Sequence, residues 1–460
     1  MVEEEQTFPD EMTLRFKKRM DLKGGENSHL KADFLALVDS DGKFRDQCYY
    51  AKEHDVGLRV REPGYTNVGD MSASLRAAIG LGEIYAGTDS PHIALSSKHT
   101  RLVAIAKGRT QLEALIKTIA GDLNSPFGGF FGFNTPIERE TAEFLGNEDI
   151  FFEGIVAPDY NKGCVGLLTR PADNTKNRFL IKYGNMDRNM LNTFGCNLQP
   201  VVGGLLRQSR EPIFDPRKEC AVVTGNKGNS DINSLDSRII DDIGFAGNAA
   251  IYISSNLVFF VIDGAIAGLG DGCGARTIAA EKSRLMLERS AYAALSREAQ
   301  ELEGADKLWD RVLYDTPFRR ENFLGLRLPR HRLVLLSDAF YPKIDGFIES
   351  AGIDRTNPQF QARAVRYSEK EHGVNVEKTF IPKRDNFDSQ YDSSLIPEVI
   401  VQPGGSLGDK LTIPMAEEYG VKMVFTMTPE VYDKYVRKEK INGRTPTGRR
   451  FFGHFPMSPS

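Results

Sequence analysis

Short apolar runs alternate with helix-like patterns along much of the chain. Residues 92–95 (HIAL) form one such run, and after a turn Leu112, Leu115, Ile116 and Ile119 follow the i, i+3, i+4, i+7 spacing of an amphipathic helix. The runs FFEGIVAP and RFLIKYG are bounded by Gly, Pro or Asn and predict strands, with a helix over IERETAEFL before the first of them. The pattern predicts a lobe in which strands and helices alternate.

The same order returns after about Ser237. A helix precedes the strand NLVFFVI, a glycine-rich turn follows, and one long helix is expected to carry Ile278, Leu285, Tyr292 and Leu295 on one side. The runs RLVLLS, EVIVQ and KMVFT predict further strands with helices between them. Two lobes of similar order predict an α/β protein with a duplicated fold, divided near the polar residues 224–237. Residues 351–397 are polar and lack periodicity, which predicts a surface insertion.

Composition and charge argue against several classes of protein. A formal net charge of −4 over 460 residues does not favour a nucleic-acid partner. The five cysteines include no C-x-x-C pair, so we expect neither a disulfide framework nor a zinc site, and a reducing cytoplasm fits best. The acidic N-terminus does not resemble a secretory signal. The longest uncharged stretch, between Asp242 and Asp263, contains Gly and Asn and predicts a buried helix and strand rather than a membrane span.

Two segments of the first lobe carry candidate chemistry. Lys98 and His99 directly follow the strand HIAL, at the sheet edge where α/β proteins gather catalytic groups. A histidine exchanges protons near neutral pH and a lysine stabilises a developing oxyanion, although an ordinary loop pair is the simpler interpretation. Residues 122–129 (DLNSPFGG) precede Phe130, Phe131 and Phe133; they predict either a pocket wall beside a planar ligand or a tight turn into a buried strand.

Residues 268–276 (GLGDGCGAR) open the long helix of the second lobe. The spacing Gly270-x-Gly272-x-x-Ala275 matches a dinucleotide fingerprint, but no acidic residue ends a second strand about 20 residues later. Anion binding at the helix start stays open beside a purely structural turn. The segments SDAFYP and QPGGS each end a predicted strand, and the C-terminal segment RFFGH follows a basic stretch that we interpret as a solvated face.

The order and spacing of these segments resemble the AICAR transformylase half of the bifunctional purine-biosynthesis enzyme that also carries IMP cyclohydrolase. Lys98-His99, DLNSPFGGFFGFN, residues 154–158 (GIVAP), VGGLLRQ, SNLVFF, GLGDGCGAR, SDAFYPKID, QPGGS and RFFGH all have counterparts in the same order, from about Leu22 to His454. The resemblance implies two tandem cytidine-deaminase-like three-layer α/β/α lobes at about residues 22–225 and 226–460, after an N-terminal lead of residues 1–21. It also implies a cytoplasmic homodimer with shared active sites.

The resemblance further implies a reaction and a set of site residues. The reaction is formyl transfer from 10-formyltetrahydrofolate to the 5-amino group of AICAR, the 5-aminoimidazole-4-carboxamide ribonucleotide, giving FAICAR. Lys98, His99 and Asn256 match the catalytic positions and Arg276 a substrate-contacting arginine; Asn67, Gly128, Gly129, Glu153, Phe340, Arg450 and His454 would face the nucleotide, and Pro342 and Asp345 the folate. A monovalent cation is a further candidate ligand, and no other metal is expected. Deaminase chemistry is not implied, because the zinc signature H-x-E with P-C-x-x-C is absent from the sequence.

Three departures from the family pattern bear on the substrate. Lys23-Gly24 stand where the family has an arginine and a tyrosine, Thr100 follows the Lys-His pair, and Lys343 replaces a phenylalanine near the folate position. Lys23 would then help Arg276 to hold the nucleotide phosphate. The sequence leaves two alternatives open, a formyltransferase specialised for another purine-like amine and a catalytically silent nucleotide-binding paralogue. About twenty residues precede the resemblance, so we expect no cyclohydrolase domain.

Overall fold

The chain folds into two compact units. The first comprises residues 1–119 and 124–213, and the second comprises residues 120–123 and 214–453. The computed structural model describes residues 8, 10–27, 29–44, 62–147, 150–169, 178–188, 197–209, 211–225, 231–299, 301, 303–326, 333–341 and 395–451. The domain boundaries given above stay predictions, and the predicted insertion lies almost entirely outside the described residues.

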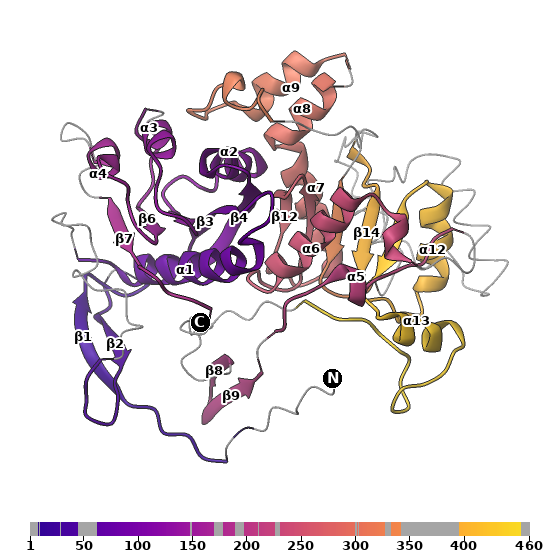
Figure 1. The fold of residues 1–460 in the computed structure, drawn as a ribbon, viewed down its shortest axis with the longest axis horizontal. Coiled ribbons are helices and arrows are strands. Elements are labelled where there is room, and N and C mark those ends of the chain that lie inside the picture. The colour runs from indigo at the N-terminus through magenta and orange to yellow at the C-terminus, as the bar shows by residue number, and fades with distance from the viewer. Residues whose placement is uncertain are drawn as a thin grey trace. The chain divides into compact units, whose positions relative to one another are not determined.

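The first unit is a mixed sheet with helices on both faces (Figure 1). Its strand order is β4-β3-β5-β6-β7; β3 is antiparallel to β4 and β5, and β5, β6 and β7 are parallel. Helix α1 covers one face of the sheet, and α2, α3 and α4 cover the other. Separate hairpins are formed by β1 with β2 and by β8 with β9. The elements are β1 (Phe16–Leu22), β2 (Ala32–Leu37), α1 (Tyr65–Tyr85), β3 (His92–Lys98), β4 (Arg101–Gly108), α2 (Gln111–Gly121), β5 (Phe130–Phe133), α3 (Arg139–Asn147), β6 (Gly154–Ala157), α4 (Cys164–Leu168), β7 (Phe179–Lys182), β8 (Asn197–Val201) and β9 (Gly204–Gln208).

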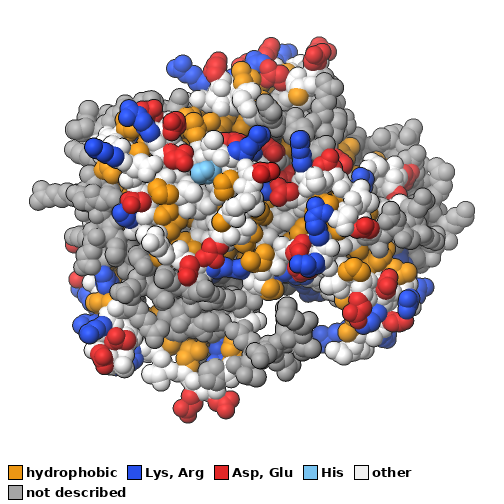
Figure 2. Space-filling model, viewed as in Figure 1, with side chains coloured by type: hydrophobic (Ala, Val, Ile, Leu, Met, Phe, Trp, Pro, Cys, Tyr) orange, Lys and Arg blue, Asp and Glu red, His pale blue; other side chains and the backbone are white. Residues whose placement is uncertain are grey.

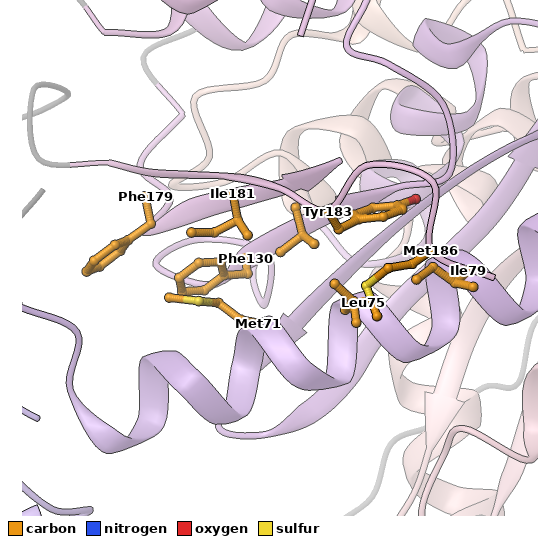
Figure 3. Close-up of a cluster of buried hydrophobic side chains, with 9 residues drawn as sticks. Met71, Leu75, Ile79, Phe130, Phe179, Ile181, Tyr183 and Met186 are labelled. Atoms are coloured by element: carbon orange, nitrogen blue, oxygen red, sulfur yellow. The ribbon is translucent and has the colours of Figure 1, made fainter. Parts of the chain in front are cut away.

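Helix α1 packs against this sheet through side chains spaced four residues apart (Figure 3). Because i and i+4 positions lie on one helix face, a single row of apolar side chains can meet the strands. The cluster comprises Met71, Leu75, Ile79, Phe130, Val156, Phe179, Ile181, Tyr183 and Met186. Phe130, Phe131 and Phe133 are fully buried and fill the core, as a turn into a buried strand leads one to expect.

The second unit contains a sheet of order β12-β11-β13-β14-β15-β10. Strand β11 is antiparallel to β12 and β13, the strands β13, β14 and β15 are parallel, and β10 is antiparallel to β15. The elements are α5 (Pro216–Glu219), β10 (Ala221–Val222), the 3-10 helix η3 (Ile232–Ser234), α6 (Ser237–Ala250), β11 (Val258–Ile262), β12 (Ala265–Gly270), α7 (Arg276–Glu288), α8 (Ala291–Ala299), α9 (Ala305–Val312), the 3-10 helix η4 (Arg320–Asn322), β13 (Val334–Ser337), β14 (Val399–Gln402), α12 (Asp409–Glu418), β15 (Lys422–Phe425) and α13 (Pro429–Val436).

The α/β class predicted from the sequence is confirmed. Each unit contains a helix (α1 or α6) followed by an antiparallel hairpin and a second helix (α2 or α7), and three parallel strands then follow in the same sheet order. The duplicated, deaminase-like character of the two lobes stays a prediction, and this repeated order is the observation that supports it.

Each unit contains a strand that the sequence analysis did not separate. Strand β4 lies between β3 and α2, where we expected only a turn, and β12 lies between β11 and the glycine-rich turn. In both hairpins the two strands are largely buried on both faces and joined by only two residues, so no alternation of polar and apolar positions marks the reversal of the chain.

The long helix expected after residue 276 is two helices, α7 and α8. Ser290 separates them: its hydroxyl donates to the carbonyl of Leu287 and accepts the amide hydrogen of Ala293, as a helix N-cap does. The expected apolar side was wrong for α7, where Ile278 is 52% and Leu285 39% exposed, whereas Tyr292 and Leu295 are buried on α8 as expected. The buried face of α7 is formed instead by Ala279, Ala280, Ser283, Arg284 and Leu287.

Helix α7 lies directly on the backbone of β12. A Cβ atom on Gly270 would lie 1.8 Å from the carbonyl oxygen of Ala279, and one on Gly268 would lie 2.5 Å from that of Ser283. Because real Cβ atoms essentially never approach this closely, both positions require glycine. Gly270, the first glycine of the fingerprint-like spacing, therefore has a packing role.

Acidic and basic side chains are interspersed over the face shown in Figure 2, as the small net charge leads one to expect. Among the helices that the structure describes, none combines the length and the apolarity that a bilayer-spanning segment requires.

Candidate active site

Lys98 and His99 lie at the tip of the β3–β4 hairpin. Lys98 is the last residue of β3, Arg101 is the first of β4, and His99 and Thr100 form the turn. Both turn residues have positive φ angles, 54° for His99 and 63° for Thr100. Two-residue hairpins favour such angles because they match the strand twist, but Asn and Gly are the usual residues there and a β-branched Thr is a strained choice.

The ammonium group of Lys98 lies at the Gly128-Gly129 loop. Its Nζ donates a hydrogen bond to the carbonyl oxygen of Phe127 at 2.7 Å. Gly128 has a φ of 71°, and a Cβ on Gly129 would lie 2.4 Å from the carbonyl oxygen of Ser97, so neither position tolerates a side chain readily. The loop therefore approaches the end of β3 backbone to backbone.

Glu153 joins the same loop from the start of β6. Its amide donates to the carbonyl oxygen of Gly129 at 2.8 Å. The amide of Gly128 donates to the carbonyl oxygen of Phe151, also at 2.8 Å. The structure thus brings together Lys98, His99, Gly128, Gly129 and Glu153 at one end of the first unit's sheet.

Lys23 lies beside the start of α1, and Asn67 lies in its first turn. The amide of Lys23 donates to the carbonyl oxygen of Pro63 at 3.0 Å, and the amide of Tyr65 donates to the carbonyl oxygen of Gly24 at 3.1 Å. Asn67 caps the helix, since its Oδ1 accepts the amide hydrogen of Gly64 at 2.9 Å. The same helix reaches the hairpin turn one turn later, because Thr100 donates its amide hydrogen to Asp70 Oδ1 at 2.5 Å.

Asp70 was not identified from the sequence. Burial raises the pKa of its carboxyl group, while hydrogen bonds from the backbone of Thr100 and His99 and the nearby charges of His99 and Lys98 act in the opposite direction. The signal available in the sequence was a single acidic residue within the otherwise uncharged run YTNVGDMSASL, but its meaning depends on a helix that the pattern did not predict.

In the second unit, the guanidinium group of Arg276 lies at the centre of a polar cluster. Its Nη2 donates to Asn256 Oδ1 at 2.9 Å and to Asp338 Oδ1 at 2.8 Å, and its Nη1 donates to the carbonyl oxygen of Phe340 at 3.4 Å. The side chain of Asp338 is 0% exposed and that of Arg276 12%, so this is a buried ion pair. Sequence reasoning named the segment that contains Asp338 but not the residue.

The side-chain amide of Asn256 is bound at both of its polar atoms. Its Nδ2 donates to the carbonyl oxygen of Cys273 at 2.8 Å, and its Oδ1 accepts the hydrogen bond from Arg276. Arg450 is exposed and places its guanidinium carbon 5.2 Å from the centre of the Phe340 ring. Asn256, Arg276, Phe340 and Arg450 therefore form one cluster of predicted residues, whereas Pro342, Asp345 and His454 lie outside the described residues.

Within the described part of the chain, no group of three or more His, Cys, Asp or Glu side chains has the arrangement of a metal site. The two clusters offer a lysine-histidine pair in one unit and an arginine-asparagine pair in the other.

Comparison with known families places these clusters in context. The sequence model described as AICARFT/IMPCHase bienzyme matches residues 1–284, which is more than half of the chain. The chain belongs to this family. The family resemblance stated from the sequence is confirmed.

Relatives in this family share a modest fraction of residues with the chain. Bifunctional purine biosynthesis protein PurH of Chlorobium phaeovibrioides is 26% identical over 417 residues, which is 91% of this chain and 59% of the relative. The protein of the same name from Rhodopirellula baltica is 30% identical over 296 residues, 64% of this chain and 51% of the relative. That from Clostridium botulinum is 27% identical over 423 residues, 92% of this chain and 60% of the relative. The chain thus spans between half and three fifths of their length.

Proposed function

We propose that the chain is a folate-dependent formyltransferase of purine biosynthesis, which transfers the formyl group of 10-formyltetrahydrofolate to the 5-amino group of AICAR. The observation that carries the proposal is the Lys98-His99 pair at the tip of a tight hairpin, with the Lys98 ammonium group at the glycine loop. Family membership supports the reaction class.

The residue types suit this reaction. The amine nitrogen attacks the formyl carbon, the bond between that carbon and N10 of the folate breaks, and N10 leaves with a proton. An aromatic amine is a weak nucleophile and must lose a proton as it attacks, which is the role of His99 as a general base. The formyl oxygen gains negative charge in the transition state, and the Lys98 ammonium group would stabilise it.

The remaining roles are carried over as predictions. Asn256 would act as a further polar catalytic group, and Arg276, Phe340 and Arg450 as contacts to the nucleotide. Lys23 would hold the phosphate together with Arg276. Pro342 and Asp345 toward the folate, a bound monovalent cation and a homodimer with shared active sites belong to the same proposal.

The reaction can be tested with the full chain by following tetrahydrofolate release from 10-formyltetrahydrofolate in the presence of AICAR and of a panel of other amines. We expect release with AICAR, and a loss of turnover of about a hundredfold or more in His99→Ala, the order expected for a missing general base. His92→Ala is the matched control, because His92 lies at the opposite end of β3 and its Nδ1 is 3.1 Å from Thr135 Oγ1.

Two results would contradict the proposal. A folded protein that releases no tetrahydrofolate with any amine would indicate the silent paralogue. Release with another amine, but none with AICAR, would retain the reaction and assign the specialised acceptor instead.

A further inference from the structure

The β3–β4 turn is held by a buried carboxylate on a different element. Asp70 of α1 is 3% exposed, and its Oδ1 accepts the amide hydrogen of Thr100 at 2.5 Å. This hydrogen bond ties the residue that follows His99 in the turn to one side chain of α1.

Further contacts fix the same end of α1 against the hairpin. Ser97 Oγ donates to the carbonyl oxygen of Asp70 at 2.8 Å and lies 2.7 Å from Ser74 Oγ. A Cβ on Gly69 would lie 2.2 Å from Thr100 Cγ2, so the helix is shaped to admit the threonine side chain. The turn is therefore enclosed by α1 on the side away from its tip.

The second unit also has a buried carboxylate that binds a hairpin turn, but its turn residues adopt positive φ angles more readily. Its β11–β12 hairpin turns at Asp263 and Gly264, with φ angles of 48° and 72°. The two amides donate to the buried Asp242 of α6, at 3.0 Å from Asp263 and 2.7 Å from Gly264. The Asp-Gly pair adopts these angles readily, whereas His-Thr does not. The carboxylate clamp is therefore common to both units, and only in the first unit does it hold a turn of unfavourable residues.

We propose that Asp70 is the positioning residue of the Lys98-His99 pair: by accepting the amide hydrogen of Thr100, it holds the strained turn in the one conformation that presents both side chains for catalysis. This inference rests on the proposed function. Asp70 acts through the backbone and does not itself touch the substrate. Without it, the turn can relax, and small displacements of a catalytic group cost large factors in rate.

The test compares Asp70→Ala with Asp242→Ala, which removes the equivalent clamp from the other hairpin. We expect Asp70→Ala to lower kcat by about tenfold or more while KM changes by less than about twofold, because positioning acts on the transition state more than on binding. Asp242→Ala should lose thermal stability without losing kcat.

Two further variants separate positioning from a general loss of structure. Asp70→Asn keeps an oxygen that can accept the Thr100 amide hydrogen, so it should recover most of the lost kcat. Thr100→Gly, added to Asp70→Ala, removes the strained β-branched residue and should recover part of it. An Asp70→Ala protein with unchanged kcat, or equal kcat losses in the Asp70 and Asp242 variants, would overturn the proposal.

Amide hydrogen exchange tests the inference without any reaction. In Asp70→Ala, the amide of Thr100 should exchange at least about tenfold faster than in the wild type, and in Asp242→Ala it should not change. If the wild type releases no tetrahydrofolate but this exchange difference is found, the proposed function fails and the clamp stands. Equal exchange in the wild type and Asp70→Ala would overturn the clamp itself.

Discussion

The two hairpins of this chain share a design and differ in the residues that form the turn. In the second unit the turn is Asp263-Gly264, the residue pair that two-residue hairpins favour. In the first it is His99-Thr100, although a buried aspartate accepts an amide hydrogen from the turn in both. The difference teaches that the first turn lacks the residues that favour its conformation, and that a side chain of α1 holds it.

The polar groups at the two candidate clusters are also held to different degrees. Lys98 makes a hydrogen bond to one carbonyl oxygen, whereas Arg276 binds Asn256, a fully buried carboxylate and a carbonyl group. Lys98 is thus the more readily removed without harm to the fold, while Arg276 is a structural residue as well as a candidate ligand contact.

The largest expected effect is a difference in stability between variants of Arg276 and Lys98. Arg276→Ala should lower the free energy of unfolding by about 3–5 kcal/mol, because it leaves the Asp338 carboxylate buried without a counter-charge. Lys98→Ala should lower it by about 1 kcal/mol or less, yet abolish most turnover. Urea unfolding of both variants measures this, and adding Asp338→Asn to Arg276→Ala should restore part of the loss. Similar losses in the two single variants would remove the distinction.

Asp409 is a third buried aspartate that accepts backbone amide hydrogens, and its effect on stability is expected to depend on pH. Asp409 Oδ2 accepts the amides of Gly405 at 2.7 Å and Ser406 at 2.9 Å, and burial raises the pKa of this carboxyl group to about 6. Because the folded-state pKa lies above the unfolded value, the protonated form stabilises the fold below about pH 4, and that contribution is lost as the pH rises through about 6.

The expected size of this effect follows from the shift. Relative to Asp409→Asn, the wild type should lose up to about 3 kcal/mol of stability between about pH 4 and about pH 7. Urea unfolding of both proteins across this range measures the difference. A difference that is independent of pH would show that the carboxyl group titrates in the ordinary range.

Exchanging the turn residues tests the cost of the first hairpin. Gly264→Thr should destabilise the protein by about 1–2 kcal/mol, because a β-branched residue is forced to a positive φ. Thr100→Gly should change stability less. Glycine removes the strain of a β-branched residue at positive φ, but this gain is offset by the greater conformational freedom of glycine in the unfolded chain. Thermal unfolding of the two variants, with Gly264→Asn as the control that tolerates the angle, gives the comparison. Equal tolerance of Thr and Asn at position 264 would contradict the argument from strain.

The smallest expected effect concerns the exposed Lys23. A lysine makes single contacts to a phosphate where an arginine makes paired ones, so Lys23→Ala should weaken AICAR binding by only about fivefold, or about 1 kcal/mol. Binding of the dephosphorylated nucleoside should not change. If the wild type binds the nucleotide and the nucleoside equally well, Lys23 is not a phosphate contact and the specialised-amine alternative gains support.

Much of the sheet could be predicted because its strands are short apolar runs bounded by turn residues. The expected strands β3, β6, β7, β11, β13, β14 and β15 and the helices α2, α3 and α6 are confirmed. Helix α1 was not predicted: Ala, Gly and Ser are spread around it and most of its length is buried, so no polar face alternates with an apolar one.

The site could be predicted only where its residues are adjacent in the sequence. Lys98-His99 and Gly128-Gly129 stand out as local segments, and the structure places them together. Asp70 and Asp338 act on groups that are far away along the chain, 30 residues in the case of Thr100 and 62 in the case of Arg276. Their roles follow from the packing of α1 and the position of β13, neither of which a local pattern contains.

The close approach of α7 to β12 has a consequence for any mutational survey of this protein. Gly268 and Gly270 admit no side chain, because a Cβ would lie 2.5 Å and 1.8 Å from helix carbonyl oxygens. An activity screen of all substitutions would score both glycines as strictly intolerant, with the same profile as a residue that touches the substrate. Only a parallel measurement of protein abundance would separate them, since variants at Gly270 should fail to accumulate while variants at His99 accumulate and do not turn over.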